Sequence, residues 1–450
     1  MRLLILTVMS FMFYGYWDYR FVLLMLISIL IDYYCGEKIS HYLVDDKKKA
    51  KGWMIVSIVS NLSILGFFKY FNFFVDSFYV VFPIESFISK PTLEVILPVG
   101  ISFYTFQSMS YSIDLYRNQA VKVQSLLHFA AYVSMFPQLI AGPIVRYSDI
   151  STQLANIKTK FNHDKFLVGL QYFTIGLFRK LFIADFFATY ADLFFSGNYE
   201  FAFIGAWLGV LSYAFQIYFD FSAYSEMAIG LGKMFGFDFP INFNSPYKAK
   251  SFSDFWLRWH ITLSRFLKDY IYIPFGGNKK GNVRTYVNLS LTMLIGGLWH
   301  GASWLFVVWG ALHGFFLMME RAISREKLAR LKFYPFIVFI CICLAWIFFH
   351  SESLGQAWTI LKSCLFINGI ENFGGDYSVF GITVPSFFKA YGGVKLIAGV
   401  VITIFIVKYI PNASAIKIKR NTMSIIFTTL ILVFCILHVS KPSPFLYFQF

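Results

Sequence analysis

Long apolar runs without charged side chains recur along almost the whole chain. Clear examples are residues 201–219, 334–349, 396–407 and 423–437. Each is close to the length that an α-helix needs to cross the hydrocarbon core of a bilayer. In lipid every backbone N–H and C=O must find its partner within the segment, so such runs fit a helical bundle. The pattern therefore predicts an all-α, polytopic transmembrane helical bundle with about eleven spans.

Composition supports a membrane protein. With 58% hydrophobic and 14% charged residues, the chain has too little polar surface to coat a soluble globule. The first run, 3–15, lacks a small-residue cleavage site, so we expect a retained helix rather than a signal peptide. The cysteines lack metal-ligand spacing, and we expect neither a disulfide framework nor a metal; they are Cys35, Cys341, Cys343, Cys364 and Cys435.

The net charge of +15 could indicate a nucleic-acid partner, but in a membrane protein excess Lys and Arg usually mark cytoplasmic loops. We therefore expect no nucleic acid and use the charge to orient the chain. The polar stretch 351–390 has no basic excess and is expected outside the cytoplasm, so that 423–437 runs outward. The basic clusters expected in the cytoplasm are 47–51, 248–284, 321–332 and 417–420.

The region 245–290 combines many basic residues with interleaved aromatic ones. Aromatic bodies with charged tips at this density predict interfacial helices on the cytoplasmic leaflet. Binding of anionic membrane lipids would account for most of this charge. The same surface could also concentrate a phosphate-bearing donor such as acetyl-coenzyme A. Candidate donor-binding residues are Arg258, Arg265 and Lys268.

His300 stands in segment 289–319, which contains no Asp, Glu, Lys or Arg. Both flanks are basic, so we expect the segment to enter the membrane and turn back, with Gly296 and Gly297 breaking the helix and His300 near the turn. A lone histidine on an apolar helix is ordinarily a hydrogen-bonded core residue. At membrane depth, however, ionisable groups tend to mark pathways or reaction centres. A neutral imidazole there could take the proton from an attacking hydroxyl as a general base.

Other polar residues give weaker candidates. His260 lies where the basic region meets the bundle and is the second catalytic candidate, while Trp299 and His313 could support His300 from the same segment. Asp220, between Phe219 and Phe221 at the end of an apolar run, is costly in a membrane unless paired. We expect it to form an ion pair or cap that fixes the bundle. An interfacial structural role is expected for His41, His128, His163, His350 and His438.

Five stretches together resemble the bacterial membrane-bound O-acyltransferase family, within it the branch of alginate O-acetylases and peptidoglycan O-acetyltransferases. They are LPVGISFYTFQ (97–107), FPQLIAGP (136–143), YFDFSAYS (218–225), FWLRWH (255–260) and GLWHG (297–301). The resemblance implies a single membrane-bound O-acyltransferase domain over residues 1–450. It also implies a helical bundle with a central funnel, in which a cytoplasmic acyl donor meets an acceptor that arrives from the other side of the membrane. It also implies that His300 is the catalytic histidine and that His260 is the family's second histidine.

The last residues, 440–450, are called the aromatic segment here. They end in FLYFQF and resemble Phe-x-Tyr-x-x-Phe tails of envelope acylation systems, in which the tyrosine is thought to carry the acyl group; an interfacial aromatic belt is the ordinary alternative. The resemblance makes Tyr447 the acyl carrier. A phenol with a pKa of about 10 needs a base to attack a thioester, and His300 could be that base.

The expected function is O-acetylation of a cell-envelope polysaccharide, peptidoglycan or an alginate-like exopolysaccharide, from the bacterial inner membrane. Similar systems use a periplasmic serine-hydrolase-like (SGNH) partner, and no Gly-x-Ser-x-Gly elbow occurs in this chain. Branch members usually begin with one more hydrophobic helix before the stretch that matches residues 2–6. Two explanations remain open: the start of this sequence is assigned too late, or this member of the branch is shorter. Three rivals also remain: a teichoic-acid D-alanyl transferase, a lipid or sterol acyltransferase, and a transporter or flippase.

Overall fold

A computed structural model of the chain provides the structure. It describes residues 1–82, 90–93, 96–157, 161–196, 202–324, 327–328, 330–369, 378–379, 382–383, 393–415, 421–439 and 445–446. Part of the polar stretch 351–390 and all of the basic cluster 417–420 therefore lie outside the described residues.

The described chain is mostly helical, which confirms the predicted all-α class. Its strands, within the described residues, are a two-residue antiparallel pair, β1 (Ser378–Val379) with β2 (Ile382–Thr383), in which Ser378 pairs with Thr383 and Val379 with Ile382. Residues 203–219 of the first apolar run lie in α11 (Phe203–Met234), and the other three runs lie in α17 (Tyr334–His350), α20 (Gly393–Tyr409) and α21 (Thr422–His438). The first run, 3–15, lies in α1 (Arg2–Trp17).

Four described segments are long and apolar enough to cross a membrane, judged by length and composition: Lys47–Val81, His163–Phe195, Trp304–Ile323 and Gly393–Ala415. Three more apolar helices are shorter: Arg2–Trp17, Tyr334–His350 and Thr422–His438. Together with the family comparison below, these helices make the chain a multi-pass membrane protein. The expected total of about eleven spans stays a prediction.

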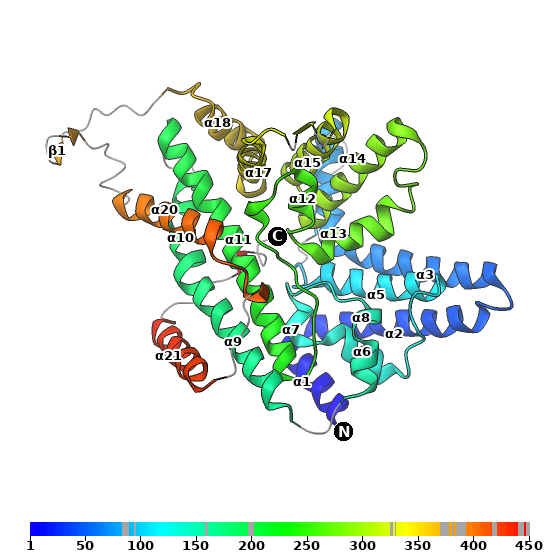
Figure 1. The fold of residues 1–450 in the computed structure, drawn as a ribbon. Coiled ribbons are helices and arrows are strands. Elements are labelled where there is room, and N and C mark those ends of the chain that lie inside the picture. The colour runs from blue at the N-terminus through cyan, green and yellow to red at the C-terminus, as the bar shows by residue number, and fades with distance from the viewer. Residues whose placement is uncertain are drawn as a thin grey trace. The chain divides into compact units, whose positions relative to one another are not determined.

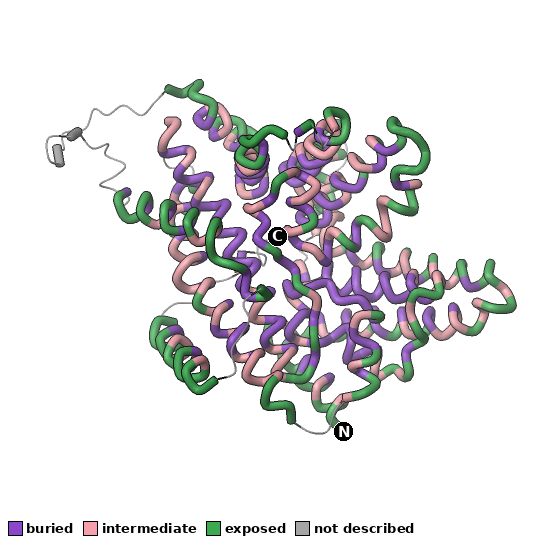
Figure 2. Tube along the Cα trace, in the orientation of Figure 1, coloured by how far each residue is buried: buried purple, intermediate pink, exposed green. Residues whose placement is uncertain are grey.

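Apolar side chains cover the outside of several helices. Figure 2 shows α21 exposed over most of its surface, and its exposed residues include Phe427, Leu430 and Leu437. In α20, Val401, Ile402 and Phe405 are likewise exposed. Patches of this kind are unfavourable in water but match lipid tails.

The chain divides into two compact units. The first comprises Met1–Phe173 and Ser225–Ile241. Within it α2, α3 and α5 pack together (Figure 1) around a buried carboxylate: Asp32 accepts hydrogen bonds from Ser57 Oγ at 2.6 Å and Asn61 Nδ2 at 2.8 Å. Its elements are α1, α2 (Arg20–Tyr42), α3 (Lys47–Leu65), the π-helical turn η1 (Gly66–Tyr70), α4 (Phe71–Val81), α5 (Ile101–Tyr116), α6 (Leu126–Ser134), α7 (Phe136–Leu139), α8 (Tyr147–Ala155), the start of α9 (His163–Arg179) and the end of α11.

The second unit comprises Thr174–Tyr224 and Asn242–Phe450 and contains every described residue of the predicted site. Short elements there alternate with long apolar helices. They are the end of α9, the π-helical turn η2 (Lys180–Ala184), α10 (Asp185–Phe195), most of α11, η3 (Pro246–Lys248), α12 (Phe252–Trp256), α13 (Ile261–Leu267), the π-helical turn η4 (Lys268–Tyr272), α14 (Gly281–His300), α15 (Trp304–Ile323), α17, α18 (Leu354–Cys364), β1, β2, α20, η5 (Ala413–Ala415) and α21.

Helices α14 and α15 form a hairpin that contains His300 (Figure 1). Helix α14 ends at His300, and Ser303 caps α15 by accepting the Leu305 N–H at 3.2 Å. The expectation that His300 lies near a turn is therefore confirmed. The expectation that Gly296 and Gly297 break the helix is wrong, because both lie inside α14.

The physical reason is close packing between the two helices. A Cβ on Gly297 would lie 2.2 Å from the Phe306 carbonyl oxygen, and one on Gly310 would lie 2.5 Å from the Met293 carbonyl oxygen. Small residues let backbones approach in membrane helix pairs, so these glycines join α14 to α15 instead of interrupting α14.

Candidate active site

His300 is buried, with 3% of its surface exposed, at the turn between α14 and α15. Aromatic rings surround it edge-on: the centroids of Trp299, Trp309 and Phe349 lie 5.0, 5.1 and 5.1 Å from that of the imidazole. Such packing fixes the orientation of the ring and excludes water. A histidine held in this way can exchange a proton with a bound substrate without competition from bulk solvent.

His260 lies beside His300, and the two imidazole centroids are 6.5 Å apart. It is fully buried in the link between α12 and α13, and its ring also faces those of Trp299 at 5.7 Å and Phe221 at 4.8 Å. Its backbone is left-handed, with φ 42° and ψ 55°. This conformation is costly for a residue with a side chain, so the surrounding contacts must enforce it. The structure thus brings together the two histidines that the sequence proposes as catalytic.

Asn242 organises the His260 turn and was not predicted from the sequence. Its side-chain oxygen lies 3.1 Å from His260 Nδ1 and accepts from Thr262 Oγ1 at 2.9 Å and Thr262 N at 3.3 Å. Its own carbonyl accepts the Ile261 N–H at 2.9 Å. With Asn242 Oδ1 as acceptor, Nδ1 carries the imidazole proton and Nε2 holds the lone pair. Burial lowers the pKa of His260 to about 3, so the ring is neutral at physiological pH.

We expect Asn242→Ala to reduce acyl transfer about 10-fold and to destabilise the fold by roughly 1–3 kcal/mol, because three buried hydrogen bonds are lost. Acyl-transfer rate and thermal unfolding in detergent would measure these effects. Asn156→Ala is the matched control, since the side chain of exposed Asn156 donates to the Thr152 carbonyl four residues earlier and is not among the candidate site residues. Wild-type activity in the Asn242 variant would contradict this role.

His313 and Trp299 complete the aromatic surroundings. His313 lies about two and a half turns after the start of α15. Its ring is between those of Trp309 at 4.6 Å and Trp256 at 5.1 Å, measured between ring centroids. Among the described residues neither His313 ring nitrogen has a hydrogen-bond partner. Trp309 touches both His300 and His313, so the two histidines are connected through that indole and not directly.

The predicted donor-binding residues fall into two kinds. Arg258 forms an ion pair with Asp254, with Nε 2.8 Å from Oδ1, and also donates to the Asn244 carbonyl at 3.2 Å. Arg265 in α13 and Lys268 in η4 are exposed. Arg258 therefore helps to fix the chain near His260, whereas Arg265 and Lys268 are accessible to a ligand.

Asp220 forms a buried ion pair with Lys180, with 2.6 Å between Oδ1 and Nζ. Tyr447, the predicted acyl carrier, lies outside the described residues. Among the residues that the structure describes, no group of three or more His, Cys, Asp or Glu side chains could hold a metal ion.

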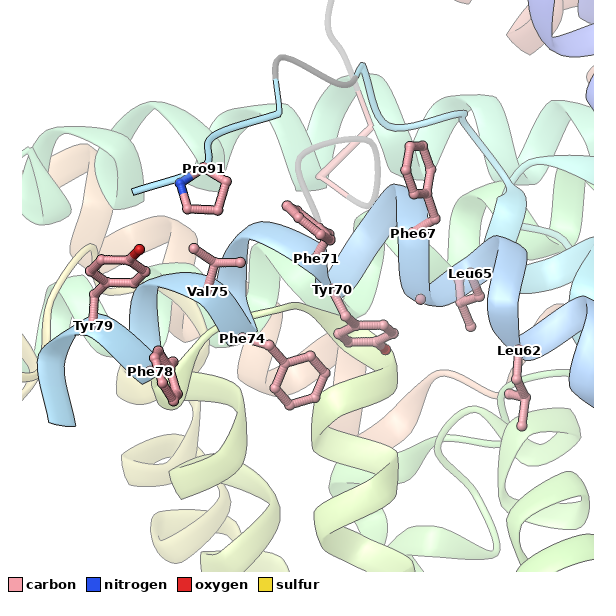
Figure 3. Close-up of a pocket in the computed structure, with 11 residues that line it drawn as sticks. Leu62, Leu65, Phe67, Tyr70, Phe71, Phe74, Val75, Phe78, Tyr79 and Pro91 are labelled. Carbon is pink, nitrogen blue, oxygen red and sulfur yellow. The ribbon is translucent and has the colours of Figure 1, made fainter. Parts of the chain in front are cut away.

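The first unit contains an apolar groove of about 740 Å³ that includes none of the predicted site residues. Figure 3 shows Phe67, Phe71, Phe74 and Phe78 along it, on η1 and α4. The lining includes two tyrosines, Tyr70 and Tyr79, but among the described lining residues there is no histidine, cysteine, acid or lysine that could activate their hydroxyls. The groove therefore does not replace the histidine pair as the candidate active site.

Comparison with known proteins gives a consistent picture. The model of the membrane-bound O-acyltransferase family matches residues 17–353. A peptidoglycan O-acetyltransferase of Helicobacter pylori is 42% identical over 399 residues, which cover 81% of this chain and 74% of the relative. A probable alginate O-acetylase of Pseudomonas aeruginosa is 44% identical over 379 residues, 80% of this chain and 69% of the relative.

A more distant relative is the teichoic acid D-alanyltransferase of Streptococcus thermophilus. It is 28% identical over 277 residues, which cover 57% of this chain and 65% of that protein. The similarity is therefore lower and shorter than that to the two O-acetylating relatives.

Proposed function

Since the chain belongs to the membrane-bound O-acyltransferase family, we propose that this acyltransferase moves acetyl groups from cytoplasmic acetyl-coenzyme A toward a cell-envelope polysaccharide. It works in the bacterial inner membrane as a multi-pass protein. The O-acetylating names of the relatives that are 42% and 44% identical favour acetyl as the group transferred.

The observation that carries the proposal is the buried pair of His300 and His260. Their centroids lie 6.5 Å apart in a setting of aromatic rings, and His300 occupies the turn of a hairpin whose second helix is long and apolar enough to cross a membrane. A transporter that is not coupled to protons needs no such buried proton acceptor. Acyl transfer to a hydroxyl does, because a neutral hydroxyl is a weak nucleophile until a base removes its proton.

In the proposed first step, Tyr447 is the nucleophile and His300 the base. His300 takes the phenolic proton while the oxygen attacks the thioester carbonyl of acetyl-coenzyme A. The carbon–sulfur bond breaks, and coenzyme A leaves as a thiol with the proton that His300 returns. The product is an acetyl ester on Tyr447, and His260 helps to hold the reacting group beside His300.

In the second step, an extracytoplasmic serine-hydrolase-like partner takes the acetyl group from Tyr447 and passes it to a sugar hydroxyl. Peptidoglycan and an alginate-like exopolysaccharide are the two acceptors that the relatives' names suggest. We favour peptidoglycan. The exposed Arg265 and Lys268 are proposed to attract the phosphates of the donor at the cytoplasmic side.

The test is to incubate the purified protein with radiolabelled acetyl-coenzyme A and to map covalent label by mass spectrometry. The proposal expects one acetyl group on the peptide that contains Tyr447, in the wild-type protein and in a His41→Ala control, since exposed His41 lies in the first unit. Absence of covalent label, or label on a residue other than Tyr447, would contradict the proposed transfer through Tyr447.

A further inference from the structure

A cluster of three charges lies at the junction of α11 with the π-helical turn η2; Asp220 and Lys180 are buried, and Asp185 is partly exposed. Asp220, 3% exposed, pairs through Oδ1 with Lys180 Nζ at 2.6 Å, and Lys180 also pairs with Asp185 Oδ1 at 2.9 Å. Two carboxylates around one ammonium leave an excess of acceptor oxygens. Charges inside a membrane protein cost free energy unless they are paired. We therefore expect each charged group of this cluster to have a partner.

The second oxygen of Asp220 holds the aromatic segment. The backbone N–H of Leu446 donates to Asp220 Oδ2 at 2.8 Å, across 226 residues of sequence. Hydrogen bonds to a buried carboxylate are stronger than neutral ones. Leu446 is itself buried, with 4% of its surface exposed, so this contact belongs to the packed second unit and not to its surface.

Phe445 adds a contact of a different kind to the same cluster. The Lys180 ammonium lies 4.9 Å from the Phe445 ring centroid, and that ring meets Tyr224 edge-on at 4.4 Å between centroids. Cation–π attraction selects an aromatic ring at this position. The carboxylate thus holds the backbone of the segment, while the ammonium and Tyr224 select one of its side chains.

We propose that Asp220 and Lys180 form a dock for the aromatic segment, with Leu446 and Phe445 as the docked residues. Tyr447 follows Leu446 directly in the chain, so a dock that holds the Leu446 amide also limits how far its covalent neighbour can move. Asp220 and Lys180 are then positioning residues for the acyl relay. This last consequence rests on the proposed function; the dock itself does not.

The test uses variants on the segment side, which leave the buried cluster intact. Leu446→Pro removes the N–H donor, and Leu446→Ala keeps it while removing the same side chain. In each background a cysteine is placed at position 443 by Ser443→Cys, and its rate of maleimide labelling is measured against protein with only the five native cysteines. Asp220→Ala is the variant on the dock side.

We expect labelling at position 443 to be at least about 10-fold faster in Leu446→Pro than in Leu446→Ala, as loss of a charge-assisted hydrogen bond implies. Asp220→Ala should accelerate labelling similarly. Equal rates in the proline and alanine variants would overturn the dock, whatever their acetyl-transfer activity. Faster labelling with unchanged acetyl transfer would leave the dock standing and count against the relay through Tyr447.

Discussion

His300→Ala is expected to lower acetyl transfer by about 10²–10⁴-fold, the usual contribution of a general base. The imidazole packs edge-on against the rings of Trp299, Trp309 and Phe349, and the neighbouring imidazole is that of His260. Initial rates with radiolabelled acetyl-coenzyme A would measure the loss. His260 should not restore the rate, since Asn242 holds it in its own turn.

The effect has to be separated from loss of packing. Removing a buried ring leaves a cavity that destabilises the fold by a few kcal/mol. His300→Gln fills most of that space but cannot act as a base at neutral pH, so it should lose activity like the alanine variant while unfolding near the wild-type temperature. A glutamine variant that transfers acetyl groups within about threefold of the wild-type rate would remove His300 from the chemistry.

The helices could be predicted from the sequence because lipid leaves few alternatives. A long uncharged run must satisfy its own backbone, so 334–349 and 423–437 had to become helices. The role of Gly296 and Gly297 could not be read in the same way. Glycine permits both a break and a close approach, and only the packing of α14 against α15 decides between them.

Candidate site residues could be singled out where their signal is local in the sequence. His300 stood out as an ionisable residue in an otherwise uncharged segment, and the structure places it at a turn. Asn242 did not stand out, because it acts on a histidine 18 residues away through a turn that has no periodic signal. A pair of asparagines at 242 and 244, just before a basic aromatic stretch, was the available hint.

The need of Asp220 for a partner could be predicted from the sequence, but the identity of its partners could not. The cost of an unpaired carboxylate in a membrane indicates the need alone. Lys180 lies in a π-helical turn, whose altered register no hydropathy pattern predicts. Leu446 contributes only its backbone amide, and every residue except proline carries that group. Contacts of this kind become visible only in three dimensions.

Tyr447→Phe is expected to lower acetyl transfer to the polysaccharide by at least about 10²-fold, because it removes the one oxygen that the relay needs. The change leaves the ring in place and should not alter the unfolding temperature. Acetylated polysaccharide, released and quantified after incubation with the partner protein, gives the measurement. Tyr409→Phe is the matched control, since exposed Tyr409 near the end of α20 has no part in the proposed route.

His300→Gln and Tyr447→Phe together separate a relay from direct transfer. If the acetyl group passes through Tyr447, the phenylalanine variant keeps His300 and its surroundings intact and still fails, because the base has no hydroxyl to activate. If the acceptor hydroxyl instead reaches His300 itself, Tyr447→Phe retains activity while His300→Gln loses it. The relay therefore requires both variants to be inactive, and activity in the phenylalanine variant alone would reassign His300 to deprotonating the acceptor.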